Sequence, residues 1–120
     1  MEFSESAGLG VYDNGILKAE GTAGNPIIFN GKQNIKGYWR GIHTETPGNR
    51  MSYVTVQHAA SNYVYCCNEK AGIIVKDGDL NISNSNILDN DGCGIFVKSG
   101  ATLTESGNTF SNNTDGHICN

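Results

Sequence analysis

The chain has 120 residues and a formal net charge of −4 at pH 7, with 38% hydrophobic and 17% charged residues. Its length suits a single domain over residues 1–120 with a core of its own. The acidic balance argues against a nucleic-acid partner, which needs a basic face to neutralise its phosphates. No apolar run reaches the roughly 18 residues of a membrane span, and the first residues do not form a signal-peptide pattern.

Glycine and asparagine are unusually frequent, with 16 and 15 residues respectively. Both residues disfavour the interior of a helix, and both supply the left-handed backbone geometry that tight turns need. The composition therefore predicts an all-β fold that is built from many short strands.

The first predicted coil spans residues 7–35 and contains three short segments in which apolar residues alternate with others. These segments are 8–11, 17–19 and 27–29, and they are separated by turn sequences rich in glycine and asparagine. Three such segments in so short a stretch predict a coil with three faces.

The second predicted coil, 36–60, has the same internal spacing as the coil that follows it. Ile42 and Val56 are 14 positions apart, and so are Ile73 and Ile87. This agreement between two dissimilar stretches indicates that the coils share one register.

A predicted inserted loop at 61–69 interrupts the succession of coils and carries Tyr63, Tyr65, Cys66 and Cys67. Loops that project from the edge of a solenoid are where such proteins usually carry variable function. The two tyrosines are therefore candidates to join a binding surface.

The remaining chain repeats one sequence nearly three times. Gly-Ile-Ile-Val-Lys-Asp-Gly at 72–78 returns as Gly-Ile-Phe-Val-Lys-Ser-Gly at 94–100, and its beginning returns at 116–118. A period in the low twenties is typical of a β-solenoid. The coils predicted for this part are 71–90, 91–113 and a partial coil, 114–120.

The repeat lengthens by one residue between the third and fourth coils. Ile73 and Ile95 are 22 positions apart, whereas Leu80 and Leu103 are 23 positions apart. The additional residue is therefore predicted to lie in the turn near Ala101.

Apolar residues at equivalent positions are predicted to stack as inward columns from coil to coil. Outward positions between them hold Ile74, Phe96 and Cys119, while Glu105 falls near the inward column of Ile82. The predicted columns are Ile42 with Ile73, Ile95 and Ile118, then Val75 with Val97, and Val56 with Ile87 and Phe110.

The four cysteines, at positions 66, 67, 93 and 119, lack the CxxC or histidine partners of a zinc pattern. Three interpretations stay open: buried or free thiols, one disulfide in an exported protein, or a bridge between the adjacent Cys66 and Cys67. The 22-residue register places Cys93 over Ala71, and the inserted loop is able to bring Cys67 near it.

Four stretches carry a family resemblance: Asn-Pro-Ile-Ile-Phe-Asn-Gly at 25–31, Gly-Tyr-Trp-Arg-Gly-Ile at 37–42, Tyr-Val-Thr-Val at 53–56, and residues 84–95. They resemble repeats of the pectin-lyase-like superfamily, especially the coils of large bacterial exported and surface proteins. The resemblance covers nearly the whole chain and implies a right-handed parallel β-helix, here of about four to five short coils, in an exported or cell-surface protein. It implies no single activity, because the superfamily includes lyases, hydrolases, epimerases, adhesins and inert stalks.

Asn90 and Asn113 match the turn position at which members of this superfamily stack asparagines. The resemblance therefore implies that their amide groups bond from coil to coil. The alternative is that both are asparagines at the surface of a turn.

Enzymes of the superfamily bind acidic sugars on an outward face with clustered carboxylates, often together with calcium. The densest acidic groups here are 77–79 and 89–91, and both fall at predicted turns, where aspartate serves the backbone. We interpret them as turn residues, and we interpret the three histidines, which share no coil position, as surface or packing residues. No metal site, cofactor or catalytic residue is predicted.

The candidate binding surface consists of Tyr38, Trp39, Arg40 and His43. Aromatic rings can stack on a sugar and a forked cation can hydrogen-bond to it, so this group is predicted to bind a glycan. In the alternative interpretation, Trp39 fills the corner of the second coil.

A short solenoid leaves unpaired strand edges, which pair with other chains unless they are blocked. His117, Ile118, Cys119 and Asn120 begin a new coil, and we predict that protomers stack end to end or exchange strands there. The expected function is therefore a non-catalytic structural or interaction module that self-associates. The alternative is a carbohydrate-binding module or a truncated polysaccharide-active enzyme.

Overall fold

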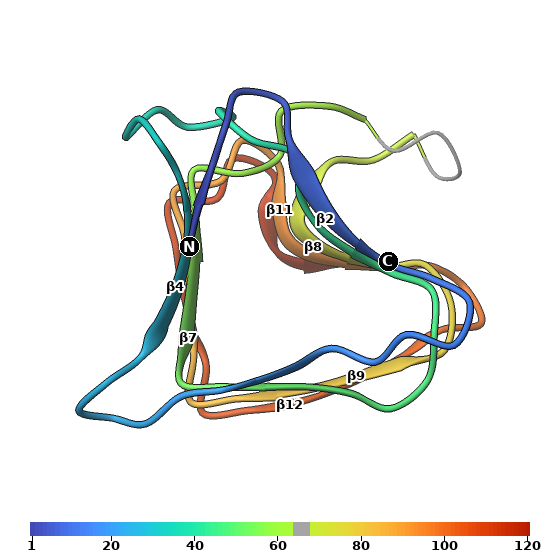
Figure 1. Ribbon diagram of the computed structural model, residues 1–120. Coiled ribbons are helices and arrows are strands. Elements are labelled where there is room, and N and C mark those ends of the chain that lie inside the picture. The colour runs from blue at the N-terminus through green and yellow to red at the C-terminus, as the bar shows by residue number, and fades with distance from the viewer. Residues whose placement is uncertain (64–67) are drawn as a thin grey trace.

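A computed structural model describes residues 1–63 and 68–120 of the chain. These residues form fourteen β-strands, and no helix in this part is long and apolar enough to cross a membrane. The strands stack in three sheets, which form the three sides of a triangle in Figure 1. Neighbouring strands within each sheet run parallel. The predicted all-β, parallel solenoid architecture is confirmed.

The chain passes from the first sheet to the second and the third, and it then returns to the first sheet one layer further along the stack. The first sheet contains β2 (Gly8–Val11), β5 (Gly41–Thr44), β8 (Ala71–Val75), β11 (Cys93–Val97) and β14 (Gly116–Cys119). The second sheet contains β3 (Lys18–Glu20), β6 (Asn49–Ser52), β9 (Asp79–Ser83) and β12 (Thr102–Ser106). The third sheet contains β1 (Glu2–Phe3), β4 (Ile27–Gly31), β7 (Val54–Gln57), β10 (Asn86–Leu88) and β13 (Thr109–Ser111).

Strand registers confirm the predicted columns of apolar side chains. In the first sheet, Ile73 lies opposite both Ile42 and Ile95, and Ile95 lies opposite Ile118. The shared register therefore extends over four layers. The other observed columns are Val75 with Val97, and Val56 with Ile87 and Phe110.

The single-residue insertion also lies where the repeat predicts it. Val97 is opposite Val75, at a separation of 22 residues, whereas Thr102 is opposite Asp79, at a separation of 23. The additional residue is therefore in the turn between β11 and β12, which contains Ala101.

The core cluster draws residues from all three sheets. Ile73, Ile87 and Ile95 are completely buried, and burial of a side chain of this size contributes about 1.5–3 kcal/mol. Because each of these residues contacts its equivalents in the layers on both sides, the columns hold the coils together.

Asparagines also stack along the solenoid, as the resemblance implies. Asn90 is fully buried, and its Nδ2 donates to Asn113 Oδ1 at 2.9 Å. Its Oδ1 accepts from the backbone N–H of Ala59 at 2.9 Å, and Asn113 Nδ2 donates to the carbonyl of Ile87 at 3.0 Å. These amides therefore satisfy backbone groups of turns that would otherwise be buried without partners.

A second apolar cluster lies outside the main core, on the outward positions of the first sheet. Ile74 and Phe96 are only 2% and 8% exposed, and they pack with Ala71, Cys93 and Cys119. A disulfide joins Cys93 to Cys119 and so ties β11 to β14. For these two cysteines the interpretation as free thiols is wrong, because pairing along the stack brings their sulfur atoms together. Tyr65, Cys66 and Cys67 lie outside the described residues.

Candidate functional site

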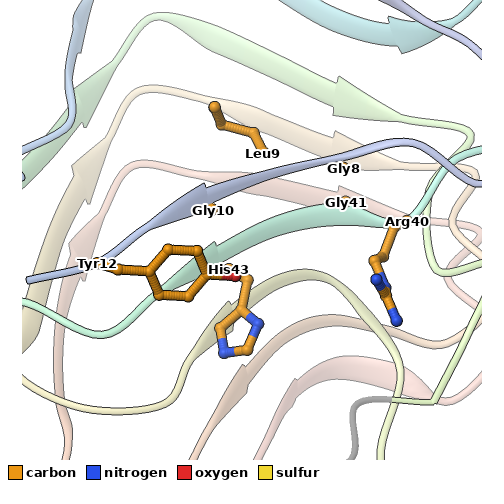
Figure 2. Close-up of a pocket in the computed structure, with 7 residues that line it drawn as sticks. All are labelled: Gly8, Leu9, Gly10, Tyr12, Arg40, Gly41 and His43. Atoms are coloured by element: carbon orange, nitrogen blue, oxygen red, sulfur yellow. The ribbon is translucent and has the colours of Figure 1, made fainter.

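A groove on the outer face of the first sheet is the best-formed candidate site. It follows β2 and β5 and has a volume of about 290 Å³. Figure 2 shows Tyr12 and His43 close together at one end of it and Arg40 at the other, while the Leu9 side chain points away, toward the core. The groove is lined by Gly8, Leu9, Gly10, Tyr12, Arg40, Gly41 and His43.

Glycines form the floor of the groove because side chains there would collide with its walls. A Cβ atom at Gly10 would lie 2.4 Å from the ring of Tyr12. At Gly41 the backbone φ is +103°, and a Cβ atom would lie 2.6 Å from the carbonyl oxygen of Gly72. The glycines therefore let the Tyr12 ring lie against the strand and expose the backbone to a ligand.

Tyr12 supplies an aromatic surface at one end of the groove. It follows β2 directly, and its side chain is 51% exposed. Its ring meets the ring of His43 edge to face, with centroids 5.9 Å apart and planes at 70°. This contact orients Tyr12 without covering the face that it presents to solvent.

His43 lies opposite Gly10 in the sheet and is held neutral by its surroundings. Burial lowers the pKa of His43, and the charges of Lys76 and Arg40 act in the same direction, while Glu45 opposes them. Nε2 of His43 is buried and makes no hydrogen bond to the described residues, and the nearest oxygen of Glu45 is 4.0 Å away. An unsatisfied buried nitrogen costs free energy. Because Nε2 is closed off from solvent, a ligand in the groove would contact this ring at its other atoms.

Arg40 immediately precedes β5 and supplies the positive charge of the groove. Its backbone N–H donates to the carbonyl of Ala7 at 2.7 Å, which fixes the main chain at this point. Its side chain is exposed and makes no ion pair with the described residues. Its forked guanidinium is thus available to an anionic group of a ligand.

Two of the four residues predicted to bind a glycan lie elsewhere. Trp39 is fully buried, stacks on Phe3 with centroids 4.1 Å apart, and donates from Nε1 to the carbonyl of Gln57 at 2.7 Å. It fills the corner of the second coil and offers no ring face to a ligand. Tyr38 is partly buried against the same core and lies over Gly31. The structure therefore places Arg40 and His43 in one groove, but it places Tyr38 and Trp39 outside that groove.

Tyr12 is the site residue that the sequence reasoning missed. A signal was present, because Gly8, Gly10 and Tyr12 alternate with inward residues and so share one face of a strand. On the neighbouring strand β5, His43 lies opposite Gly10. Only the pairing of β2 with β5 shows that these residues meet.

The acidic groups at 77–79 and 89–91 make hydrogen bonds within the protein, and Asp79 is the first residue of β9 rather than a turn residue. Asp79 Oδ1 accepts from the backbone N–H of Gly48 at 3.1 Å. Asp91 pairs with Lys70 at 3.1 Å, and this hydrogen bond is the main reason why the pKa of Asp91 is lowered. Within 1–63 and 68–120, no three His, Cys, Asp or Glu side chains are grouped so that they could hold a metal ion.

The predicted oligomer edge forms β14 at one end of the first sheet. Its side chains are largely exposed, with Ile118 at 39%, and His117 packs at a tilt on Phe110 with centroids 5.3 Å apart. The strand pairs with β11 on one side only.

Comparisons of the chain with protein-family models, curated proteins and solved structures find no match.

Proposed function

We propose that this protein is a non-catalytic interaction module whose outer groove binds an acidic saccharide. The observation that carries the proposal is that one groove with a floor of glycine has Tyr12 and His43 at one end and Arg40 at the other. Arg40 would pair with a carboxylate of the sugar through two parallel hydrogen bonds. The exposed face of Tyr12 would stack on the apolar face of the ring, and the edge-to-face contact with His43 would hold Tyr12 in place.

Binding without cleavage fits the composition of the groove. Hydrolysis of a glycosidic bond takes two carboxyl groups at a set separation. The described residues that line the groove are glycine, leucine, tyrosine, arginine and histidine. They supply donors, an aromatic face and an imidazole, which suit recognition of an acidic sugar better than acid–base chemistry.

We further propose that the solenoid is a right-handed β-helix of the pectin-lyase-like kind. A connection between parallel strands of one sheet is right-handed in nearly all proteins, and each coil here makes such a connection between layers of the first sheet. The Cys93–Cys119 disulfide supports an exported protein, because disulfides persist in oxidising compartments. An experimental structure that shows left-handed coils would contradict this assignment.

A binding titration tests the groove. An oligogalacturonate and a neutral oligosaccharide of equal length would be added to the labelled protein while amide chemical shifts are followed. We expect only the acidic sugar to shift the amides of Gly10, Gly41 and His43.

Arg40→Gln should weaken this binding by at least about tenfold, the loss expected for one charge-assisted hydrogen bond. The matched control is Arg50→Gln, because Arg50 is exposed on β6 in the second sheet. Equal losses of affinity in both variants would show that only net charge matters and would contradict binding in the groove.

Self-association is a second candidate function, favoured by the end strands of the three described sheets, which have one partner each. Among the described strands, β12, β13 and β14 each pair on one side only, as do β1, β2 and β3 at the other end. Leu103 and Phe110 at one end, and Leu9 and Leu17 at the other, are only partly buried. A neighbouring copy that pairs with these strands would cover both their edges and their apolar side chains.

Light scattering at micromolar concentration tests this second candidate. We expect an assembly larger than one protomer, and we expect Ile118→Lys to dissociate it by placing a charge at the edge. Ile28→Lys is the control, because Ile28 is similarly exposed, at 42%, but lies on β4, which has neighbours on both sides. A monodisperse monomer of the unaltered chain would rule self-association out.

A further inference from the structure

A second hollow lies at the corner where the chain leaves the third sheet. It has a volume of about 460 Å³ and shares no lining residue with the groove on the first sheet. Every side chain that lines it is polar or charged. The lining residues are Asn34, Lys36, Gln57, His58, Asp89 and Asn112.

Three of these residues occupy the same turn position in successive coils. His58, Asp89 and Asn112 all have positive φ values, of 65°, 54° and 54°, a conformation in which Asn, Asp and His are enriched among non-glycine residues. The backbone N–H of His58 donates to the carbonyl of Asp89 at 3.0 Å, and that of Asp89 donates to Ser111 at 3.2 Å. The turns therefore stack, and three polar side chains stand in a column along one wall of the hollow.

The column is only partly satisfied by its own hydrogen bonds. Asn112 Nδ2 donates to Asp89 Oδ1 at 2.7 Å, which fixes the carboxylate. The second carboxylate oxygen of Asp89 makes no hydrogen bond to the described residues. His58 is only 8% exposed, yet its Nδ1 has no partner in the described chain. Burial lowers the pKa of His58, which favours the neutral ring. Because Nδ1 is closed off from solvent, a ligand in the hollow would meet this ring at Nε2, which accepts a hydrogen bond when Nδ1 carries the proton.

The other lining residues supply donors and a balancing charge. Lys36 is exposed and makes no ion pair with the described residues, so its ammonium group offers three donors. Amide groups of Asn34 and Gln57 can each donate and accept. The site therefore contains one carboxylate and one ammonium group, and its formal charge is zero.

This donor set favours a neutral ligand that is rich in hydroxyl groups. An anion would be repelled by Asp89, and a divalent cation would find only His58 and Asp89 as strong ligands. A zwitterion would pair with the two charged groups but would leave the amides and the imidazole without hydrogen-bond partners. Hydroxyl groups, by contrast, donate to Asp89 and His58 and accept from Lys36 and the amides.

We propose that the hollow around His58, Asp89 and Asn112 is a binding site for the vicinal hydroxyl groups of a neutral saccharide. It is independent of the acidic-sugar groove, because the two sites share no residue and carry different charges. Evidence against binding at one site would therefore not count against binding at the other. If both hold, the module contacts a polysaccharide at two places along its surface.

The probes for this site are the methyl glycosides of mannose, galactose and glucose at millimolar concentration. We expect at least one of them to shift the amides of His58, Asp89 and Asn112 and leave those of Gly10 and Gly41 unchanged. Asp89→Asn keeps a residue that tolerates the left-handed turn, and it should weaken binding by at least about tenfold. Asp13→Asn is the matched control, since Asp13 also has a positive φ, of 58°, and lies outside the hollow.

His58→Asn is the second variant, because asparagine suits the same backbone conformation and removes the imidazole. It should weaken the glycoside response while the spectrum of the rest of the protein stays unchanged. The proposal is overturned if none of the glycosides shifts these amides. It is also overturned if glycine, tested as a zwitterion, shifts them and the glycosides do not, or if Asp13→Asn weakens binding as much as Asp89→Asn.

Discussion

The third and fourth coils have similar sequences, and their first strands β8 and β11 are both buried, but their second strands β9 and β12 differ in burial. Leu80 and Ile82 on β9 are buried, whereas Leu103 and Glu105, at the same register on β12, are partly buried and exposed. The third coil has a described layer on each side, and β12 has one on a single side. The difference shows that burial in a solenoid depends on neighbours along the stack as much as on the residue itself, which is why a glutamate is tolerated opposite Ile82.

Leucine truncation in the two coils should give the largest contrast in stability. Leu80→Ala should lower the free energy of unfolding by about 2–5 kcal/mol, because it leaves a cavity in a fully covered core. Leu103→Ala should cost about 1 kcal/mol or less, since part of that side chain is already in water. Chemical unfolding followed by circular dichroism measures both values, and equal losses would contradict the role given to stacking.

Removal of the disulfide should affect the last layer more than the middle of the stack. Replacing Cys93 and Cys119 by serine opens a link between residues separated by 26 positions, a loop whose closure contributes up to about 3.5 kcal/mol. Because the side chains of β14 are mostly exposed, we expect this strand to open first. Hydrogen exchange should show faster exchange in β14 than in β8, and unchanged protection of β14 would count against this.

The stacked asparagines should show the same gradient on a smaller scale. Asn90→Ala leaves the buried N–H of Ala59 without its acceptor, which should cost about 1–3 kcal/mol. Asn113→Ala should cost less, because Asn113 is only partly buried and its turn is closer to solvent. Thermal unfolding of the two variants compares them directly, and a larger loss at Asn113 would reverse the expected order.

The smallest expected effect is a dependence of stability on pH through the second coil. Burial lowers the pKa of both His43 and His58 below the ordinary value of 6.5. The unfolded chain therefore binds protons first as the pH falls, so stability is full above about pH 6.5 and declines below it. His43→Gln combined with His58→Asn should flatten this profile. An unchanged profile in the double variant would show that other groups cause the decline.

The candidate groove could be predicted only in part. Arg40 and His43 were identified because a cation and an imidazole close in sequence stood next to aromatic residues. Trp39 belongs to the same sequence group, but its ring lies buried in the corner of the coil. There it stacks on Phe3 and donates a hydrogen bond to the carbonyl of Gln57. Tyr12 came from a different coil and from a position 28 residues before Arg40, so no local pattern joined it to the site.

The column in the second hollow was hidden for a related reason. His58 and Asp89 are 31 positions apart, whereas Asp89 and Asn112 are 23 apart. The inserted loop at 61–69 accounts for the longer interval and removes the periodicity that would have aligned His58 with the other two. Their equivalence becomes visible when the hydrogen bond from His58 N–H to the Asp89 carbonyl shows that the turns are stacked.

The sequence by itself determined the all-β solenoid, the inward columns and the position of the one-residue insertion. It could do so because a repeated coil places identical residue types at identical points, and the apolar pattern then reports the register directly. The tertiary structure decided which outward residues meet: Tyr12 with His43, Cys93 with Cys119, and His58 with Asp89. The outward residues in these pairs differ in type from layer to layer, so no repeated pattern aligns them. Their neighbours are set by the stacking of layers that lie far apart along the chain.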